Sequence, residues 1–259
     1  MIYGNLKSQK ILKELIEKDV SPILVVGPEG VGKFSFLKEY LDSQKIEKIA
    51  IQTEDKNFKI ETARSLVSLS QKKSEKRIVL IDNAHKFQIY SQNTLLKTFE
   101  ETPSKTIFIL VSHQENKILS TIRSRSIKVK FGLVKKEETE KFLKEKGFSQ
   151  KEIDSALDFY PYQPGKALRF LNSRRFEFLN KFLTQPELNF EELKNSFTLQ
   201  EFLENYLLFL RKELLKKLKE NNPISGEIKK IKDCLNLYYD SDYNLNFELQ
   251  LANLILSHG

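Results

Sequence analysis

The sequence predicts an α/β fold, with a parallel sheet domain at residues 1–131 followed by helical domains at 132–172 and 173–259. Short segments rich in Val and Ile alternate with helical segments over residues 22–131, which is typical of a parallel sheet with crossover helices. From about residue 173 onward only helical periodicity remains. At roughly 100–200 residues per domain, a chain of 259 residues suggests one large domain or two to three smaller ones.

Five segments are expected to form the sheet. Each is four to six residues long, and the apolar residues run continuously instead of alternating, which is typical of strands buried on both faces. The expected strands are 23–26, 46–51, 78–81 and 107–111, with 127–131 as a closing strand. Helical segments lie between them at about 33–41, 60–71 and 88–101.

The region after residue 132 predicts a small helical domain. A helix over 135–146 ends at Gly147. Ser149 and Glu152 form a capping box, in which each side chain bonds the backbone of the other, and this predicts the start of the next helix. Pro161 and Pro164 interrupt the helical pattern after it.

The C-terminal region predicts a long amphipathic helix. Thr198 and Glu201 form a second capping box. Apolar residues come after it with i, i+3/i+4 spacing: Phe202, Leu203, Tyr206, Leu207, Leu210 and Leu214. Because residues 206–210 are apolar all round, we expect this helix to be buried, either in a bundle or at a subunit contact.

The composition indicates a globular protein of the cytoplasm. Hydrophobic residues make up 40% and charged residues 30%, which excludes a disordered chain. No run approaches the ~18 apolar residues of a membrane span, and the N-terminus has no apolar signal segment, so we expect no membrane association. The single cysteine, Cys234, excludes an intrachain disulfide and a Cys-based structural zinc site.

The net charge of +8 is unevenly distributed. Residues 1–171 carry 31 basic and 22 acidic side chains, a net charge of +9, whereas residues 172–259 carry 12 and 13. A basic region suits a polyanionic partner such as DNA. A Lys-rich surface that only keeps the protein in solution explains the same excess, so charge alone leaves both interpretations open.

A phosphate-binding loop comes directly after the first expected strand. Residues 27–33 match the pattern G-x-x-x-x-G-K at the start of a helix. The glycines let backbone N–H groups turn toward a phosphate, the helix N-terminus adds a favourable dipole, and a lysine neutralises charge. The expected nucleotide-binding residues are Gly27, Pro28, Glu29, Gly30, Val31, Gly32 and Lys33.

Two positions lack the groups that nucleotide hydrolysis needs. Phe34 replaces the Ser or Thr hydroxyl that holds Mg²⁺, and Ser35 points about 100° away around the helix. The apolar strand 78–81 ends in Asp82, which can support Mg²⁺ through water. Asn83 replaces the carboxylate that polarises the attacking water. We therefore expect a nucleotide-hydrolysis fold that no longer hydrolyses nucleotide.

These elements, taken in order, resemble the clamp-loader branch of the AAA+ ATPases, and within it the delta-prime subunits of bacterial DNA polymerase III. Residues 2–5 resemble the N-terminal box before the phosphate loop, and residues 93–103 resemble the family's NALLKTLEEP helix. Residues 121–126 resemble the segment with the Ser-Arg-Cys motif, with Ser126 in place of Cys. Residues 163–168 resemble the SPGRAL turn of the small domain, and beyond about residue 171 the chain matches only in being helical.

The resemblance implies an AAA+ P-loop sheet domain, a small helical lid domain and a C-terminal all-α collar domain through which five protomers assemble. It implies a subunit that does not hydrolyse ATP and acts with gamma/tau and delta subunits in a hetero-pentamer, which loads the sliding clamp onto primed DNA. The family's Ser-Arg-Cys arginine, which projects into a neighbouring subunit's ATP site, corresponds to Arg125. Ser112 corresponds to the sensor-1 position, although a strand-end Ser is also a common turn residue.

The chain departs from the family in having no zinc module. Delta-prime subunits commonly carry a four-Cys module between the phosphate loop and the acidic strand, whereas Lys33 and Asp82 are 49 positions apart with no Cys between them. We expect no zinc and no required cofactor, with weak binding of ATP or ADP left open. His85, His113 and His258 have no metal-ligand spacing and are expected to be exposed or structural.

Two other functions are compatible with these motifs. An active, gamma-like, DNA-dependent ATPase would use Ser35 and a substitute base. A stand-alone DNA-binding P-loop protein would account for the charge of residues 1–171. Phe34 and Asn83 argue against the ATPase, and an arginine finger, which needs a neighbour, argues against the stand-alone protein.

Overall fold

The computed structural model describes residues 3–44, 47–51, 76–100, 106–172 and 199–240. The chain divides into two compact units, one of residues 1–147 with 162–166, and one of residues 148–161 with 167–259. The first unit contains the sheet, and the described part of the second is helical. The three domain ranges expected from the sequence remain predictions.

The first unit is built on a five-stranded sheet in the order β2-β3-β4-β1-β5. Its strands are β1 (Ile23–Val26), β2 (Glu47–Ile51), β3 (Arg77–Ile81), β4 (Thr106–Ser112) and β5 (Ile127–Lys130). Every pairing is parallel. The five expected strands are thus confirmed, with ends that differ by at most one residue.

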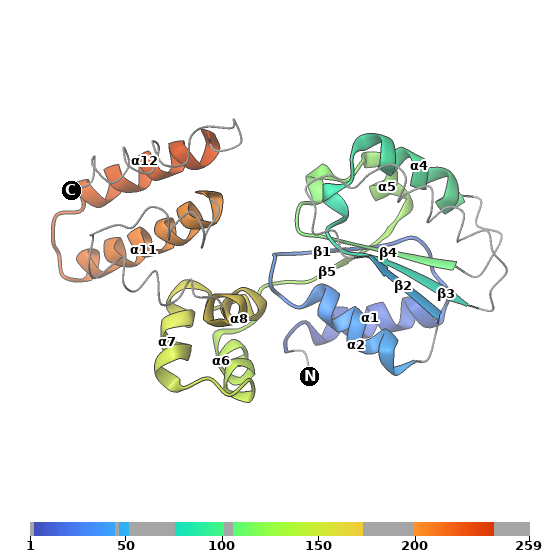
Figure 1. The fold of residues 1–259 in the computed structure, drawn as a ribbon, viewed down its shortest axis with the longest axis horizontal. Helices are drawn as coiled ribbons and strands as arrows, with labels where there is room; N and C mark the ends of the chain where they lie inside the picture. The colour runs from blue at the N-terminus through green and yellow to red at the C-terminus, as the bar shows by residue number, and fades with distance from the viewer. Residues whose placement is uncertain (1–2, 45–46, 52–75, 101–105, 173–198, 241–259) are drawn as a thin grey trace. The chain divides into compact units, whose positions relative to one another are not determined.

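Helices cover both faces of this sheet (Figure 1). One face carries α1 (Leu6–Glu17) and α2 (Lys33–Ser43), and the other carries α4 (Ile89–Glu100) and α5 (Ser120–Arg125). Short 3₁₀ turns come after two strands: η1 (Ala84–Lys86) after β3 and η2 (Glu115–Lys117) after β4. The expected helices at 33–41 and 88–101 are confirmed, and the one at 60–71 lies outside the described residues.

Alternate residues of the central strands form two cores, one on each face of the sheet. Ile23 and Val25 pack with buried residues of α1 and α2, whereas Leu24 and Val26 pack with buried residues of α4 and α5. Burial on both sides explains the continuous apolar runs of β1, β3 and β4, because every residue of these three strands is buried.

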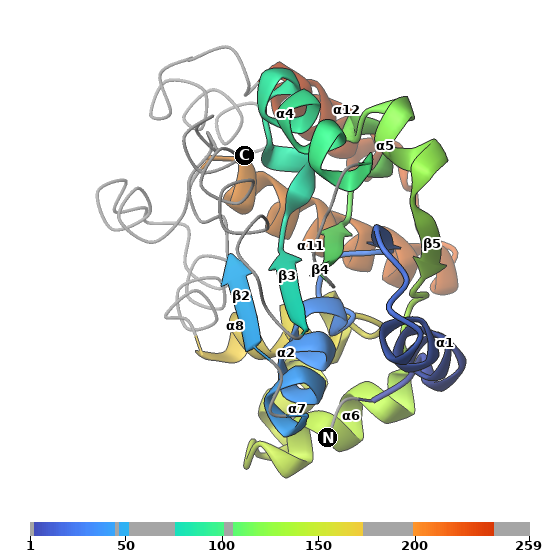
Figure 2. The ribbon, with the colours of Figure 1, turned by 90° about the vertical axis from the view of Figure 1, so that its right-hand side faces the viewer.

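The prediction that all strands are buried on both faces is wrong for β5. This strand pairs with β1 alone and lies at an edge of the sheet, beside α1 (Figure 2). Val129 is buried, but Ile127 is 47% exposed and Lys128 and Lys130 are exposed. A strand at a sheet edge has a neighbouring strand on one side only, which leaves more of its side chains in water.

Three helices come after the sheet: α6 (Lys136–Glu145), α7 (Gln150–Phe159) and α8 (Pro164–Asn172). The helix expected at 135–146 is confirmed as α6. The capping box ahead of α7 is also confirmed, because the Ser149 N–H donates to Glu152 Oε2 at 2.8 Å and Ser149 Oγ accepts from the Glu152 N–H.

The second unit contains α11 (Leu199–Lys219) and α12 (Ser225–Asp240), which pack on each other, and α7 packs on α11. Tyr160 Oη donates to Asn205 Oδ1 at 2.8 Å in this core. Of the expected apolar stripe, Phe202, Leu203 and Leu210 are buried, whereas Tyr206, Leu207 and Leu214 are partly exposed. Burial of this helix is thus confirmed only for part of its stripe. Thr198, the expected cap, lies outside the described residues.

Candidate functional site

The phosphate loop, Asp82 and Ser112 lie at one edge of the sheet. They come after or end β1, β3 and β4, which are parallel and adjacent, so their carboxyl ends share an edge. Val26, the residue before the loop, is paired in register with Ser112. The carboxylate of Asp82 acts electrostatically on Lys33. The structure therefore brings together the nucleotide-binding residues that the sequence predicts.

Glycines give the loop its conformation. Gly27, Gly30 and Gly32 have positive φ angles of 149°, 78° and 87°. A Cβ on Gly27 would lie 2.1 Å from the carbonyl oxygen of Phe131, so no other residue fits there. Gly32 caps α2 in the left-handed region, which allows the helix to begin directly at Lys33.

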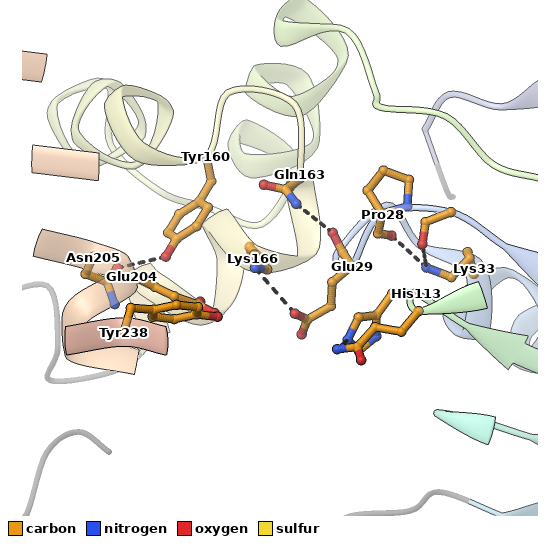
Figure 3. A network of polar contacts seen from close by, with 12 residues as sticks. Pro28, Glu29, Lys33, His113, Tyr160, Gln163, Lys166, Glu204, Asn205 and Tyr238 are labelled. Atoms are coloured by element: carbon orange, nitrogen blue, oxygen red, sulfur yellow. Dashed lines mark hydrogen bonds and ion pairs between the residues drawn. The ribbon is translucent and has the colours of Figure 1, made fainter. Parts of the chain in front are cut away.

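The Lys33 ammonium is buried and bonds to the loop's own backbone. Its Nζ donates to the carbonyls of Gly27 at 2.7 Å and Pro28 at 2.6 Å (Figure 3). These bonds engage two of its three N–H groups. Burial lowers the pKa of Lys33 to about 8, even though the carboxylates of Asp82 and Glu29 act in the opposite direction.

The neighbouring residues of the loop face the core instead of a phosphate. Val31 is fully buried and Phe34 packs partly buried against the core that α1 and α2 share with the sheet. Ser35 is exposed. A phenyl ring that packs on the core provides no oxygen for Mg²⁺.

Asp82 is bonded by the residue directly after it. The Asn83 N–H donates to Asp82 Oδ1 at 2.9 Å, and Asn83 adopts the left-handed conformation with φ 50°. Burial raises the pKa of Asp82, and the Asn83 N–H and Lys33 oppose that rise. The Asn83 amide nitrogen lies 3.5 Å from the other carboxylate oxygen. The group beside Asp82 is thus an amide, which cannot accept a proton from water.

Two histidines lie beside Ser112. Ser112 Oγ is 3.3 Å from His85 Nδ1, and the rings of His85 and His113 meet edge to face with centroids 4.1 Å apart. Burial lowers the pKa of His85 to about 4, so this ring is neutral at pH 7, and burial also lowers the pKa of His113. Buried His85 fits the expected structural role, and His258 lies outside the described residues.

The two histidines were not expected in the site, although the sequence carries a signal for them. His85 lies three residues after Asp82, and His113 comes directly after Ser112. Both therefore come just after parallel strands that end at the same edge of the sheet. Among the residues that the structure describes, no cluster of three His, Cys, Asp or Glu side chains could hold a metal ion.

The segment from 163 to 166, at the start of α8, contacts the phosphate loop. Gln163 Nε2 donates to the Glu29 carbonyl at 3.1 Å, and the Gly165 N–H donates to the Gly30 carbonyl at 2.8 Å. Lys166 Nζ lies 3.4 Å from Glu29 Oε2 (Figure 3). Glu29, which the sequence predicts to bind nucleotide, is thus bonded to this segment through both its backbone and its carboxylate.

Arg125 is the last residue of α5, the short helix that packs against α4. Its side chain is exposed, and Nη1 donates to the Thr121 carbonyl at 3.3 Å. Arg123, two residues earlier in the same helix, is exposed as well. The guanidinium of Arg125 is therefore accessible at the surface of this chain.

The family model and the curated relatives that match this chain are subunits of DNA polymerase III. A family model described as "DNA polymerase III, delta subunit" matches residues 38–135. DNA polymerase III subunit gamma of Buchnera aphidicola subsp. Schizaphis graminum is 37% identical over 89 residues, 33% of this chain and 24% of the relative. Subunit delta′ of Buchnera aphidicola subsp. Baizongia pistaciae is 27% identical over 163 residues, which are 60% of this chain and 48% of the relative. The matched part thus spans half or less of these relatives' own length.

Similar solved structures agree in fold. A gamma-subunit-related protein of Thermotoga maritima superposes with a TM-score of 0.63 at 19% identity, over 97% of this chain and 98% of that one. RuvB of the same organism superposes with a TM-score of 0.51 at 14% identity, over 69% of this chain and 64% of the RuvB chain. These likenesses confirm the AAA+ α/β fold. The family model and the gamma and delta′ relatives are all subunits of DNA polymerase III, so the chain is similar to subunits of this polymerase in sequence.

Proposed function

We propose that this chain is a non-hydrolysing, delta-prime-type subunit of the DNA polymerase III clamp loader. In this proposal it assembles through its C-terminal helices, as a collar, with gamma/tau and delta subunits into a hetero-pentamer. The complex works in the cytoplasm and loads the sliding clamp onto primed DNA. The chain supplies Arg125 in trans to the ATP bound by a neighbouring gamma/tau subunit.

The observation that carries the proposal is the loss of both hydrolytic groups from an otherwise formed site. Phe34 packs on the core where a Mg²⁺-binding hydroxyl is needed. Asn83 places an amide beside Asp82 where a general base is needed. The loop and the strand ends are retained, so the fold is kept while the chemistry of water attack is missing.

The exposed position of Arg125 supports the role in trans. A guanidinium brought to a neighbour's γ-phosphate stabilises the charge that develops there during hydrolysis. An arginine supplied in this way is worth about 10³–10⁵ in rate in GTPases. Since Arg125 is exposed at a helix end, its side chain is accessible to another subunit.

Steady-state ATP hydrolysis with primed DNA tests the proposal. The chain alone, the gamma/tau subunit of the same organism alone, and the mixture are compared. We expect no turnover by the chain and acceleration of its partner in the mixture, with most of that acceleration lost in Arg125→Ala. Arg123→Ala, an exposed arginine of the same helix, is the matched control and should retain it. Acceleration that survives Arg125→Ala would contradict the finger.

A gamma-like ATPase is the second candidate function. It is favoured by the 37% identity to a gamma subunit over 89 residues, which exceeds the 27% identity to a delta′ subunit over a longer match. This function predicts turnover by the chain alone, abolished by Lys33→Ala. Such turnover would overturn the non-hydrolysing proposal.

A further inference from the structure

We propose that Glu29 and Lys166 form a latch that holds residues 163–166 on the phosphate loop, and that the Glu29 carboxylate weakens the binding of nucleotide phosphates there. The proposal concerns the loop of the free chain and does not depend on the role of Arg125. Here "latch" means the ion pair between the Glu29 carboxylate and the Lys166 ammonium, 3.4 Å apart.

The latch lies where the two segments already touch at their backbones. The Gly165 N–H donates to the Gly30 carbonyl at 2.8 Å. A Cβ on Gly30 would lie 2.8 Å from the Lys166 backbone nitrogen, and one on Gly165 would lie 3.0 Å from the Gly30 oxygen. Because a side chain on Gly30 would force the Lys166 backbone to shift, this close approach depends on a glycine at position 30.

The latch also engages a cation that a phosphate would use. Lys166 reaches the loop, but its ammonium is paired with the Glu29 carboxylate instead of being available to an anion. Lys33 is likewise bonded to the carbonyls of Gly27 and Pro28. The loop therefore satisfies both of these cations with its own oxygens in the free chain.

The negative charge of Glu29 acts on the phosphate position itself. Its carboxylate stabilises the charged forms of Lys33 and His113, so its field reaches the ammonium that a phosphate must approach (Figure 3). A phosphate at Lys33 would meet repulsion from this carboxylate, and Asp82 adds a second negative charge near the same lysine. Removal of one such charge several ångströms from a phosphate changes affinity by about tenfold at the dielectric of a protein surface.

The pair is accessible enough to open. The Lys166 and Glu29 side chains are 21% and 37% exposed. Ion pairs with this exposure are screened by salt. The latch therefore opens and closes in solution instead of sealing the loop permanently.

Two variants separate the effect of the ion pair from the effect of the negative charge on Glu29. Glu29→Gln removes both the ion pair and the repulsion, whereas Lys166→Met removes the ion pair and leaves the carboxylate in place. Hydrogen exchange of the Gly165 amide reports whether the contact opens, and calorimetric titration with ADP reports binding. We expect faster Gly165 exchange in both variants, by severalfold, and about tenfold tighter ADP binding in Glu29→Gln only.

Glu115→Gln is the matched control. It breaks the 2.7 Å ion pair between Glu115 and Lys128, and these two side chains are about as exposed as those of Glu29 and Lys166. It should change neither exchange at Gly165 nor ADP binding. Unchanged Gly165 exchange in both latch variants would overturn the latch. Faster exchange in Glu29→Gln without tighter ADP binding would overturn the inference that the Glu29 carboxylate weakens nucleotide binding. Neither result depends on the ATPase of a partner, so each is distinguishable from a failure of the proposed function.

Discussion

Replacement of Lys33 by methionine is expected to stabilise the free protein at neutral pH. Lys33 is 7% exposed, and burial lowers its pKa from 10.5 to about 8. At about 1.4 kcal/mol per pH unit, this difference means that folding disfavours the charged form by about 3 kcal/mol. The bonds to Gly27 and Pro28 are lost in the variant, but water reaches these partly exposed residues. The expected gain in the free energy of unfolding is therefore about 1–3 kcal/mol.

The energetic penalty of burying charged Lys33 depends on pH. Below pH 8 Lys33 is protonated in both the folded and the unfolded chain, so the whole penalty is present. Between pH 8 and 10.5 the folded chain loses its proton first, and the penalty disappears as pH rises. Lys33→Met has no such penalty, so its advantage over the natural chain should be largest at pH 7 and small near pH 10.5.

Urea denaturation of both proteins at pH 7 and pH 10 measures this difference, and titrating groups that do not interact with Lys33 cancel in the comparison. Lys38→Met, at an exposed position of the same helix, is the control and should change stability by less than about 0.5 kcal/mol at either pH. The reasoning is refuted if Lys33→Met is less stable at pH 7, or if its advantage is the same at both pH values.

Three further outcomes are expected. Gly27→Ala should lose more than about 3 kcal/mol in urea denaturation, because its Cβ would meet the Phe131 carbonyl, whereas Gly226→Ala, with open space around it in α12, should gain up to about 1 kcal/mol. His85 has a pKa of about 4 when folded against an ordinary 6.5, so stability should fall by up to about 3 kcal/mol as pH falls from 6.5 to 4. His85→Gln should show a smaller fall, and an identical acid profile would exclude His85 as its source. Cys234 is fully buried with a pKa raised to about 12, so a thiol reagent at pH 8 should modify it only as fast as the second unit opens; rapid native-state reaction would contradict this burial.

The sheet could be predicted because its physical cause lies in local sequence. Ile23 and Leu24 face opposite cores, and each core requires an apolar residue, so a doubly buried strand has to read as a continuous run. The exposure of Ile127 could not be predicted in this way. It depends on which strands stand at the edges of the sheet, and this order is a property of the topology.

The site was predictable to the same extent. Lys33, Asp82 and Ser112 each come after or end a recognisable strand, and parallel strands bring such positions to one edge. The contact of Glu29 with residues 163–166 was not predictable, since Gln163 and Glu29 are 134 positions apart and no local pattern links them. The place of His85 beside Ser112 likewise depends on the register of two neighbouring strands.

The close packing around the loop's glycines has a consequence for how such chains change over evolutionary time. Gly27 is required by the carbonyl of Phe131, and Gly30 by the backbone at Lys166, whether or not a nucleotide ever occupies the loop. Selection for a stable fold alone therefore preserves these glycines in descendants that have lost ATP. Position 34, where the side chain needs no special backbone conformation, is free to diverge first. In proteins of this kind, an intact glycine pattern indicates ancestry and close packing of the loop. The neighbouring polar positions indicate whether nucleotide hydrolysis is still possible.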